Sequence, residues 1–169
     1  MRNPACVPVS DGWTVCLVQP VGMVFVGFRI AVPPGWTEQR TGKATYFYAP
    51  GRGWSMEIDL TPHTYSNMLT EAKYLESQVV AQDKFPNYKR AGMEAVLIRG
   101  INGAFWQFTW TPSGGAKMRA DDILFIKPTA AGSQSYAIYF RAPTPGNDWN
   151  NKYLPVFKKM LRTFQPVSS

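Results

Sequence analysis

The sequence is poor in the residues from which metal and redox centres are built. Among its 169 residues it has two cysteines, Cys6 and Cys16, and one histidine, His63. A structural zinc site takes four Cys or His ligands, so these three side chains are too few to form one. His63 has no cysteine beside it, which favours a surface or capping role over catalysis. We predict no metal site and no cofactor.

Long apolar runs are absent as well. The longest apolar stretch, residues 21–36, is interrupted by glycines, by Arg29 and by a Pro-Pro pair, and it falls short of the roughly 20 apolar residues of a membrane-spanning helix. Residues 1–13 lack the basic and then apolar pattern of an export signal. We therefore expect any signal or membrane anchor to lie outside these residues, and membrane contact to require such an anchor.

The sequence also contains none of the common catalytic motifs. GxSxG, the phosphate-binding P-loop, GxGxxG, HExxH and CxxC are all missing. Asp121 and Asp122 are consecutive, so on a strand they point to opposite faces and cannot act as a paired acid and base. We predict a non-catalytic domain. The alternative is a small secreted enzyme whose site has no recognisable motif.

The residues that are present describe one folded domain spanning residues 1–169. Apolar residues make up 45% and charged residues 17%, and the 14 glycines and 14 prolines favour strands joined by turns. The net charge of +7 could attract an acidic partner, but the basic residues are scattered. Their densest group, Lys152, Lys158, Lys159 and Arg162, has helical spacing near the C-terminus, where basic side chains complement the helix dipole. Nucleic-acid binding is therefore not predicted.

The two cysteines lie in a segment with the pattern of a β-hairpin. Within residues 5–18, Ser10–Gly12 forms a three-residue turn with glycine where a positive φ is needed. This register puts Cys6 opposite Cys16 in a non-hydrogen-bonded pair, close enough for a disulfide. A two-residue turn would misalign the pair and leave two reduced thiols. We favour the disulfide, and with it an oxidising, extracytoplasmic compartment.

Hydrophobic periodicity predicts two helices and a series of strands joined by short turns. The helix over residues 66–84 has Ser66 as its cap, and the helix over 147–164 becomes regular near Pro155, a residue tolerated in a first turn. Residues 100–103 form a turn. Strands joined by short turns pair antiparallel, so the fold class is α+β, with helices packed on a mostly antiparallel sheet. The predicted strands are 25–32, 45–50, 54–60, 88–100, 103–110, 117–127 and 135–142, of which the second and third form a hairpin.

The strand over residues 103–110 has large apolar side chains at every second position. Trp106 and Trp110 share one side of it, which is either a platform for a ligand or part of the core. Strands 28–32 and 56–60 show the same split, so we predict that these apolar sides form the core under the helices. The polar sides then form the candidate binding face, or else a solvated face of cross-strand charge pairs. The candidate binding residues are Arg29, Glu57, Asp59, Gln107, Tyr139 and Arg141.

Several motifs resemble one known group of domains. They are FRIAVPPGW at 28–36, AFWQFTW at 104–110, SYAIYFRAP at 135–143 and the closing Phe164. These pieces resemble the extracytoplasmic domains of actinobacterial proteins with a PsbP-like fold. That group includes the C-terminal extracellular regions of membrane-anchored serine/threonine kinases and the LpqN-type lipoproteins.

The resemblance implies an α/β/α sandwich with a central antiparallel sheet over residues 24–166, preceded by an N-terminal hairpin extension over residues 1–23. It also implies a non-catalytic binding or sensor domain of a membrane-anchored or secreted protein. The expected partner is an unknown protein or a small polar ligand. The resemblance transfers no catalytic residue and no cofactor to this sequence.

Overall fold

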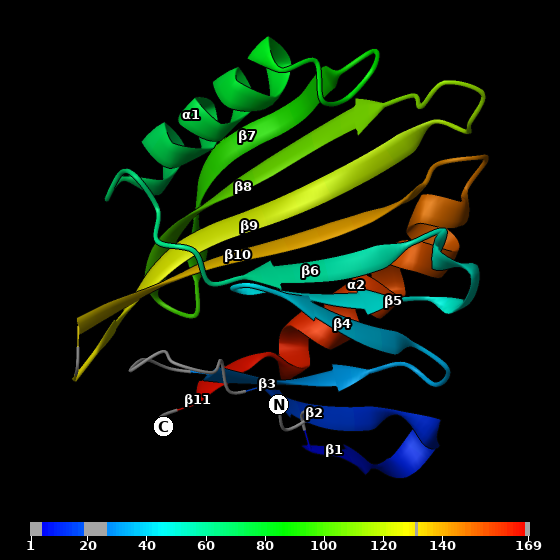
Figure 1. The fold of residues 1–169 in the computed structure, drawn as a ribbon, viewed down its shortest axis with the longest axis vertical. Helices are drawn as coiled ribbons and strands as arrows, with labels where there is room; N and C mark the ends of the chain where they lie inside the picture. Colours follow the sequence, from blue (N-terminus) through cyan, green and yellow to red (C-terminus); the bar gives the residue numbers. More distant parts are fainter. Residues whose placement is uncertain (1–4, 19–26, 131, 168–169) are drawn as a thin grey trace.

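A seven-stranded antiparallel sheet forms the centre of the fold in the computed structural model, which describes residues 5–18, 27–130 and 132–167 (Figure 1). Every neighbouring pair of strands in this sheet runs antiparallel. In spatial order the strands are β4 (Thr37–Thr41), β5 (Ala44–Tyr48), β6 (Ser55–Asp59), β10 (Gly132–Pro143), β9 (Met118–Thr129), β8 (Ile101–Trp110) and β7 (Lys89–Ile98).

A smaller, four-stranded sheet carries the cysteine hairpin (Figure 1). Cys16 and Val18 of its strand β2 are buried in the same apolar core as side chains of the large sheet, so the hairpin is packed onto the main body of the domain. In spatial order its strands are β1 (Ala5–Pro8), β2 (Thr14–Val18), β3 (Gly27–Val32) and β11 (Gln165–Val167).

The two helices cover opposite faces of the large sheet. Helix α1 (Met68–Ala81) contacts β7, β8 and β9. Helix α2 (Leu154–Thr163) packs Phe157 against Phe140 of β10 on the other face, with ring centroids 4.7 Å apart. The small sheet adds its buried side chains to the α2 side. The α+β class and the layered sandwich predicted from the sequence are confirmed.

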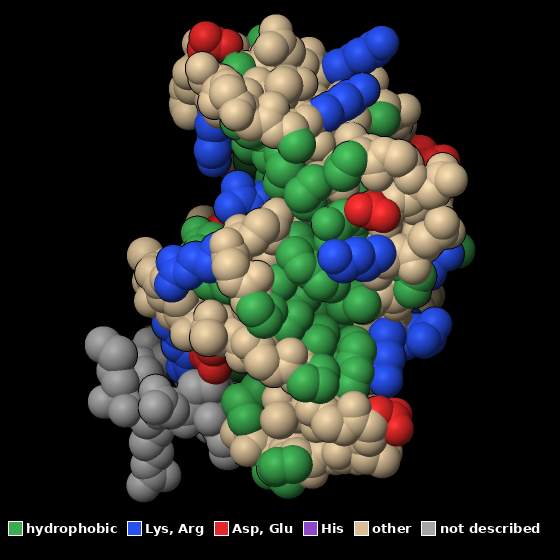
Figure 2. Space-filling view, turned by 90° about the vertical axis from the view of Figure 1, so that its right-hand side faces the viewer, with side chains coloured by type: hydrophobic (Ala, Val, Ile, Leu, Met, Phe, Trp, Pro, Cys, Tyr) green, Lys and Arg blue, Asp and Glu red, His purple; other side chains and the backbone are tan. Residues whose placement is uncertain are grey.

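Basic side chains are spread over the molecule. Seen from the side, apolar side chains form a band along the long axis, with Lys and Arg side chains on both sides of the band (Figure 2). On this face the positive charge does not gather into one patch, in line with the scattered basic residues of the sequence.

The ends of α1 differ from the predicted ones. Asn67, not Ser66, caps the helix, because its Oδ1 atom accepts a hydrogen bond from the Thr70 amide at 3.0 Å. The helix ends at Ala81, before the predicted end. Asp83 then takes a left-handed φ of 50°, a conformation that stops a helix.

The other predicted elements agree with the structure except at the edges of the sheets. Helix α2 follows a π-helical turn (Trp149–Tyr153) and has Pro155 in its first turn, as predicted. The patterns miss β4 and β11. Strand β4 is a polar edge strand that alternates between exposed and half-buried side chains, so it lacks the apolar signal of a core strand. Residues 25–26 of the first predicted strand lie outside the described residues.

The turn between β7 and β8 is tighter than predicted. Arg99 and Gly100 form it, with left-handed φ values of 50° and 82°. Gly103 therefore lies inside β8 instead of in the turn. A Cβ atom at that position would lie 2.6 Å from the Leu124 carbonyl oxygen and from Ile98 Cδ1, so this close contact between strands requires glycine.

The apolar sides of the predicted strands do not share one face. On β8, Trp106 and Trp110 are 3% and 5% exposed and pack with α1, so their assignment to the core is confirmed. On β6, Met56 and Ile58 belong to the core on the α2 side. The prediction of one common apolar face is wrong, because β10 and β9 separate these strands and their register turns the apolar positions to opposite sides.

The cysteine hairpin is confirmed. Cys6 is paired with Cys16 in the strand register, and the two form a disulfide with Cα atoms 4.1 Å apart. The turn closes through a hydrogen bond of 2.8 Å from the Val9 amide to the Trp13 carbonyl. Gly12 has the positive φ expected of it, 74°.

Reducing the disulfide is expected to lower the free energy of unfolding by roughly 2–3 kcal/mol, because the bond joins residues ten positions apart and restricts the unfolded chain. Urea denaturation with and without reductant measures the difference. The double variant Cys6→Ser, Cys16→Ser is the control, since reductant should leave its stability unchanged. Equal stability of the oxidised and reduced wild-type protein would contradict this expectation.

The substitution Trp106→Ala is expected to lower the free energy of unfolding by about 3–5 kcal/mol, because it removes a buried ring from the core under α1. Trp106→Phe keeps a ring and should cost less, although it removes the hydrogen bond from Nε1 to the Tyr88 hydroxyl at 3.0 Å. Urea and thermal unfolding measure both variants. A Trp106→Ala protein as stable as wild type would show that this side chain is not core.

Candidate functional site

Helix α1 leaves a large part of its face of the sheet uncovered. It lies over β7, β8 and β9, while β10, β6 and β5 extend beyond it (Figure 1). A helix is roughly 10 Å wide, about twice the roughly 4.8 Å spacing between neighbouring strands. Because two spacings separate three strands, one helix covers about three strands. Within the described residues, the main contacts of α1 with the sheet are to β7, β8 and β9, so side chains on the same face of the strands beyond them lie beside the helix and not under it.

The strand register lines up one row of side chains across this open area. Tyr46 of β5 is opposite Glu57 of β6, and Glu57 is opposite Tyr139 of β10. Tyr139 is opposite Asp122 of β9, which is opposite Trp106 of β8. Paired positions point to the same face of a sheet, so this row runs from the open strands to the core under α1.

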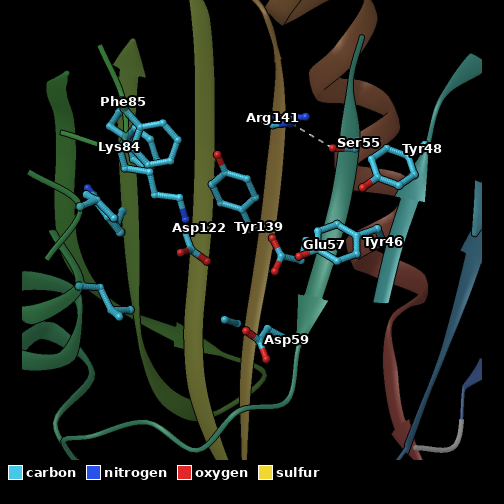
Figure 3. Close-up of a pocket in the computed structure, with 15 residues that line it drawn as sticks. Tyr46, Tyr48, Ser55, Glu57, Asp59, Lys84, Phe85, Asp122, Tyr139 and Arg141 are labelled. Carbon is cyan, nitrogen blue, oxygen red and sulfur yellow. Dashed lines mark hydrogen bonds between the residues drawn. The ribbon is translucent and has the colours of Figure 1, made fainter. Parts of the chain in front are cut away.

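The row forms the floor of a cavity of about 360 Å³, which we call the α1 cleft (Figure 3). Helix α1 supplies one wall through Leu75 and Val79, and the segment after the helix adds Lys84 and Phe85. A cavity of this size fits a small molecule. Neighbouring positions on the strands complete the lining: Tyr48, Ser55, Asp59, Phe108, Ala137 and Arg141.

Three carboxyl groups share the α1 cleft. Burial raises the pKa of Glu57 above its ordinary value, and the negative charge of Asp59 adds to the rise. Burial also raises the pKa of Asp122 well above its ordinary value, and the charges of Glu57 and Asp59 act in the same direction. The cleft therefore holds acidic groups that are costly to ionise where they stand.

Asp122 lacks a partner for one of its carboxyl oxygens. The residue is 8% exposed, and no donor within the described residues reaches its buried Oδ1 atom. Figure 3 shows this carboxyl group directed into the α1 cleft near Tyr139. A buried acceptor without a donor costs roughly 1–3 kcal/mol, so a donor placed against Oδ1 would be bound favourably.

Two basic side chains also line the cleft. Arg141 is held by Ser55, since its Nε donates to the Ser55 hydroxyl oxygen at 3.3 Å. The Lys84 ammonium nitrogen lies 5.6 Å from the centre of the Phe85 ring. The positive charges of Lys84 and Arg141 lower the pKa of Glu57 but do not overcome the effect of burial.

A pair of stacked tyrosines forms the outer rim. Tyr46 and Tyr48 are two positions apart on β5, and their rings stack with centroids 5.8 Å apart and an interplanar angle of 3°. The guanidinium group of Arg52 lies over the Tyr48 ring, 4.5 Å from its centre. Burial, the charge of Glu57 and a hydrogen bond to that residue raise the pKa of Tyr46 to about 12.

Four of the six candidate binding residues meet in this cleft. Glu57 and Asp59 of β6 and Tyr139 and Arg141 of β10 all line it. They come together because β6 and β10 are neighbours and present alternate residues to the same face. Whether they bind a ligand stays a prediction.

Arg29 and Gln107 lie elsewhere, so the prediction of one shared polar face is wrong for these two residues. Arg29 is exposed on β3 of the small sheet. Gln107 is on β8 but points to the α2 side, where its Nε2 donates to Asp121 Oδ1 at 3.1 Å. Asp121 and Asp122 do point to opposite faces, as predicted.

The sequence patterns did not predict a binding role for four other cleft residues: Asp122, Tyr46, Tyr48 and Lys84. The alternation in residues 45–50 does indicate that the two tyrosines share one side of a strand. Their neighbours across the sheet, however, depend on β10 lying between β6 and β9, an order that no local pattern contains.

The side chain of His63 is buried, so the expected surface role is wrong. Its side chain is 5% exposed, with Nε2 3.0 Å from the Tyr136 carbonyl oxygen and Nδ1 3.7 Å from Glu71 Oε1. Since a carbonyl only accepts hydrogen bonds, Nε2 carries the proton in this contact. The His63 amide also donates to Ser135 Oγ at 3.0 Å. These contacts tie the loop before α1 to β10, away from the α1 cleft.

A second cavity, of about 680 Å³, lies on the α2 side and is lined mainly by apolar side chains of β7 to β10 and the end of α2. Arg99 at its rim donates to the Leu161 and Arg162 carbonyl oxygens, each at 3.0 Å, and so caps the end of α2. This cavity lacks the converging polar groups of a specific site, which makes the α1 cleft the better candidate.

The described residues contain no group of three or more His, Cys, Asp and Glu side chains placed to hold a metal ion. Within the same residues, no helix has the length and apolar character needed to cross a membrane.

Solved proteins of dissimilar sequence share this fold. The Ran-binding protein Mog1p of Saccharomyces cerevisiae gives a TM-score of 0.58 at 12% identity, over 90% of this chain and 95% of that one. LpqN of Mycobacterium tuberculosis, which is involved in cell envelope biogenesis, gives 0.58 at 11% identity, over 93% and 92%. The cyanobacterial PsbP protein of Synechocystis gives 0.53 at 13% identity, over 88% and 96%. The domain therefore has a Mog1/PsbP-like fold, as the resemblance implies.

No curated protein matches this sequence. A family of known domains does: the serine/threonine kinase C-terminal domain matches residues 25–166, which is most of the chain. The resemblance to kinase-associated domains indicated by the sequence motifs is confirmed by this match. The chain belongs to the family of serine/threonine kinase C-terminal domains, an accessory domain and not the kinase catalytic domain.

Proposed function

We propose that this domain is the extracytoplasmic sensor part of a membrane-anchored serine/threonine kinase, and that it binds a small polar ligand in the α1 cleft. The observation that carries the proposal is the cleft itself. It is a cavity of molecular size in which side chains from five strands and the α1 segment converge. In it the buried Oδ1 atom of Asp122 has no donor within the described residues. Such a cavity is the usual form of a small-molecule site.

The disulfide supports a location outside the cytoplasm. Structural disulfides persist in oxidising compartments and are rare in the cytosol, where thiols are kept reduced. The Cys6–Cys16 bond fixes the hairpin that contributes Cys16 and Val18 to the core. LpqN, which has the same fold, is involved in cell envelope biogenesis, and this agrees with the same placement.

The position of the cleft also suits a sensor. Its walls come from two parts of the fold: Leu75 and Lys84 from α1 and the segment after it, and Glu57 and Tyr139 from β6 and β10. A ligand bound between them contacts both parts at once. It would therefore hold α1 against the open strands. A ligand that favours this position of α1 changes the local conformation, and a receptor can transmit such a change to the parts of the protein that contact it.

A second candidate function is favoured by one observation. Glu57 and Asp122 are two carboxyl groups with raised pKa values in one cavity, a pattern that also occurs in active sites. In that case the domain would be a small enzyme that uses these groups as general acid and base. The fate of a bound ligand separates the two functions: a sensor releases it unchanged, and an enzyme converts it.

Filling the cleft is expected to abolish ligand binding without unfolding the domain. Ala137 is half-buried in the cleft, so Ala137→Leu places extra side-chain volume there. Ala95→Leu is the matched control, because Ala95 is exposed on β7 outside the cleft. A library of amino acids, sugars, polyamines and nucleotides is screened for compounds that raise the melting temperature. A ligand at a hundredfold excess over its Kd stabilises by about 2.7 kcal/mol.

Compounds that stabilise the wild type should also stabilise Ala95→Leu and should not stabilise Ala137→Leu. An equal response of Ala137→Leu would place the ligand site elsewhere, and a library without any stabilising compound would contradict a small polar ligand. Mass spectrometry of each hit after incubation then distinguishes a sensor, which leaves it intact, from an enzyme.

A further inference from the structure

We propose that the α1 cleft selects a cationic ligand, a small molecule that carries a protonated amine beside an apolar body. The inference rests on the proposed function, since it names the class of ligand for the same cleft. It starts from Asp122, whose carboxyl group is directed into the cavity and whose Oδ1 atom has no donor within the described residues (Figure 3).

The acidic groups are arranged around one point of the floor. Asp122 on β9 and Glu57 on β6 are both opposite Tyr139, so they flank that residue from either side. Asp59 is two positions from Glu57 on the same face of β6. Its Oδ1 accepts hydrogen bonds from the Thr61 amide at 2.8 Å and the Thr61 hydroxyl at 2.6 Å, which fixes the carboxylate at the cleft.

Aromatic rings surround the same point. The strand neighbours of Asp122 on its two sides are Trp106 and Tyr139, and the ring of Phe108 lies 6.2 Å from that of Tyr139. Phe85 adds a further ring from the segment after α1. Aromatic faces attract cations, and the attraction is stronger where water is excluded. A carboxyl group among aromatic rings is therefore the environment that an ammonium group prefers.

The other classes of ligand fit less well. An anion would make the ionisation of Glu57 and Asp122 still more costly, and a neutral molecule would supply no positive charge to offset that cost. The raised pKa values of Glu57 and Asp122 agree with this: these groups ionise more readily once a positive charge lies beside them. Of the two basic side chains at the cleft, Arg141 already donates from its Nε atom to the Ser55 hydroxyl oxygen, so this donor is not available to an anionic ligand.

Lys84 shows how an ammonium group enters this cleft. Its side chain extends into the cavity from the segment after α1, and its positive charge acts on Glu57 (Figure 3). The residue is exposed, so the side chain can move out towards solvent. Lys84 would therefore compete with a cationic ligand, and its removal should strengthen the binding of one.

Three probes of similar size that share a phenyl ring test the charge preference: benzylammonium, benzyl alcohol and benzoate. Each is titrated into the isotope-labelled domain at neutral pH, and the backbone amide signals of Asp122, Tyr139 and Glu57 are followed by NMR. Benzylammonium should bind at least roughly tenfold more tightly than the other two, the size expected for a hydrogen bond to a charged group.

Two substitutions and one matched control show where in the cleft the cation binds. Asp122→Asn should weaken the binding of benzylammonium by roughly tenfold and leave benzyl alcohol unchanged, because it removes the charge and keeps the shape. Asp121→Asn is the matched control: the neighbouring carboxyl group is also buried, but on the α2 side, so the probes should bind as to wild type. Lys84→Met should tighten the binding of benzylammonium. The amide spectrum of each variant establishes that it is folded.

Equal or tighter binding of benzyl alcohol or benzoate at the same amides would overturn the preference for cations and leave the cleft as a ligand site. The preference is also wrong if none of the three probes moves these signals, or if Asp122→Asn and Asp121→Asn behave alike. In each of these cases the proposed ligand site is judged separately by the response of Ala137→Leu.

Discussion

Helix α1 is narrower than the sheet on which it lies. The sheet has seven strands, and α1 packs against the three at one edge. Trp106, Phe108 and Trp110 lie under the helix and are buried, whereas the same face of β6 and β10 carries Glu57 and Arg141. The change from apolar to polar side chains thus follows the border of the helix, and the α1 cleft lies on that border.

A polar network holds α1 at the β7 edge of the sheet. Glu76 of the helix accepts hydrogen bonds from the Tyr88 hydroxyl at 2.5 Å and from Arg90 Nε at 2.7 Å. Tyr88 in turn accepts a hydrogen bond from Trp106 Nε1 at 3.0 Å. The hydrogen bond from Arg90 lowers the pKa of Glu76, which keeps this carboxylate ionised. Because the helix is fixed at this edge, the open strands stay on the other side of it.

The opposite face is covered by α2 together with the small sheet. Phe157 of α2 packs against Phe140 of the large sheet. Phe164, which follows the helix, packs against Phe28 of the small sheet, and all four rings belong to one core. The disulfide-linked hairpin contributes to the same layer through Cys16. The polar site and the structural disulfide therefore belong to different faces of the sheet, so changes to one need not alter the other.

The sequence predicted the parts of this fold that depend on local patterns. The register of the cysteine hairpin, the burial of Trp106 and the first-turn position of Pro155 follow from turn chemistry, alternation and the geometry of proline. The candidate site was predicted only in part. Glu57 and Tyr139 meet because β6 pairs with β10, while Gln107 points away because the register pairs it with Asp121 and not with Asp122. Such strand order arises from tertiary packing, so sequence alternation alone could not reveal it.

The ionisation of Asp122 is the most direct measure of whether the cleft holds a buried, unpaired carboxyl group. A pH titration of its side-chain carbon-13 carboxyl signal, assigned by comparison with Asp122→Asn, follows this single group. If the carboxyl group is buried beside the charges of Glu57 and Asp59 and its Oδ1 atom accepts no hydrogen bond, its pKa lies well above the ordinary value of 3.8. A titration at the ordinary value would mean that Asp122 is solvated or already paired, and would contradict the account of the α1 cleft given above.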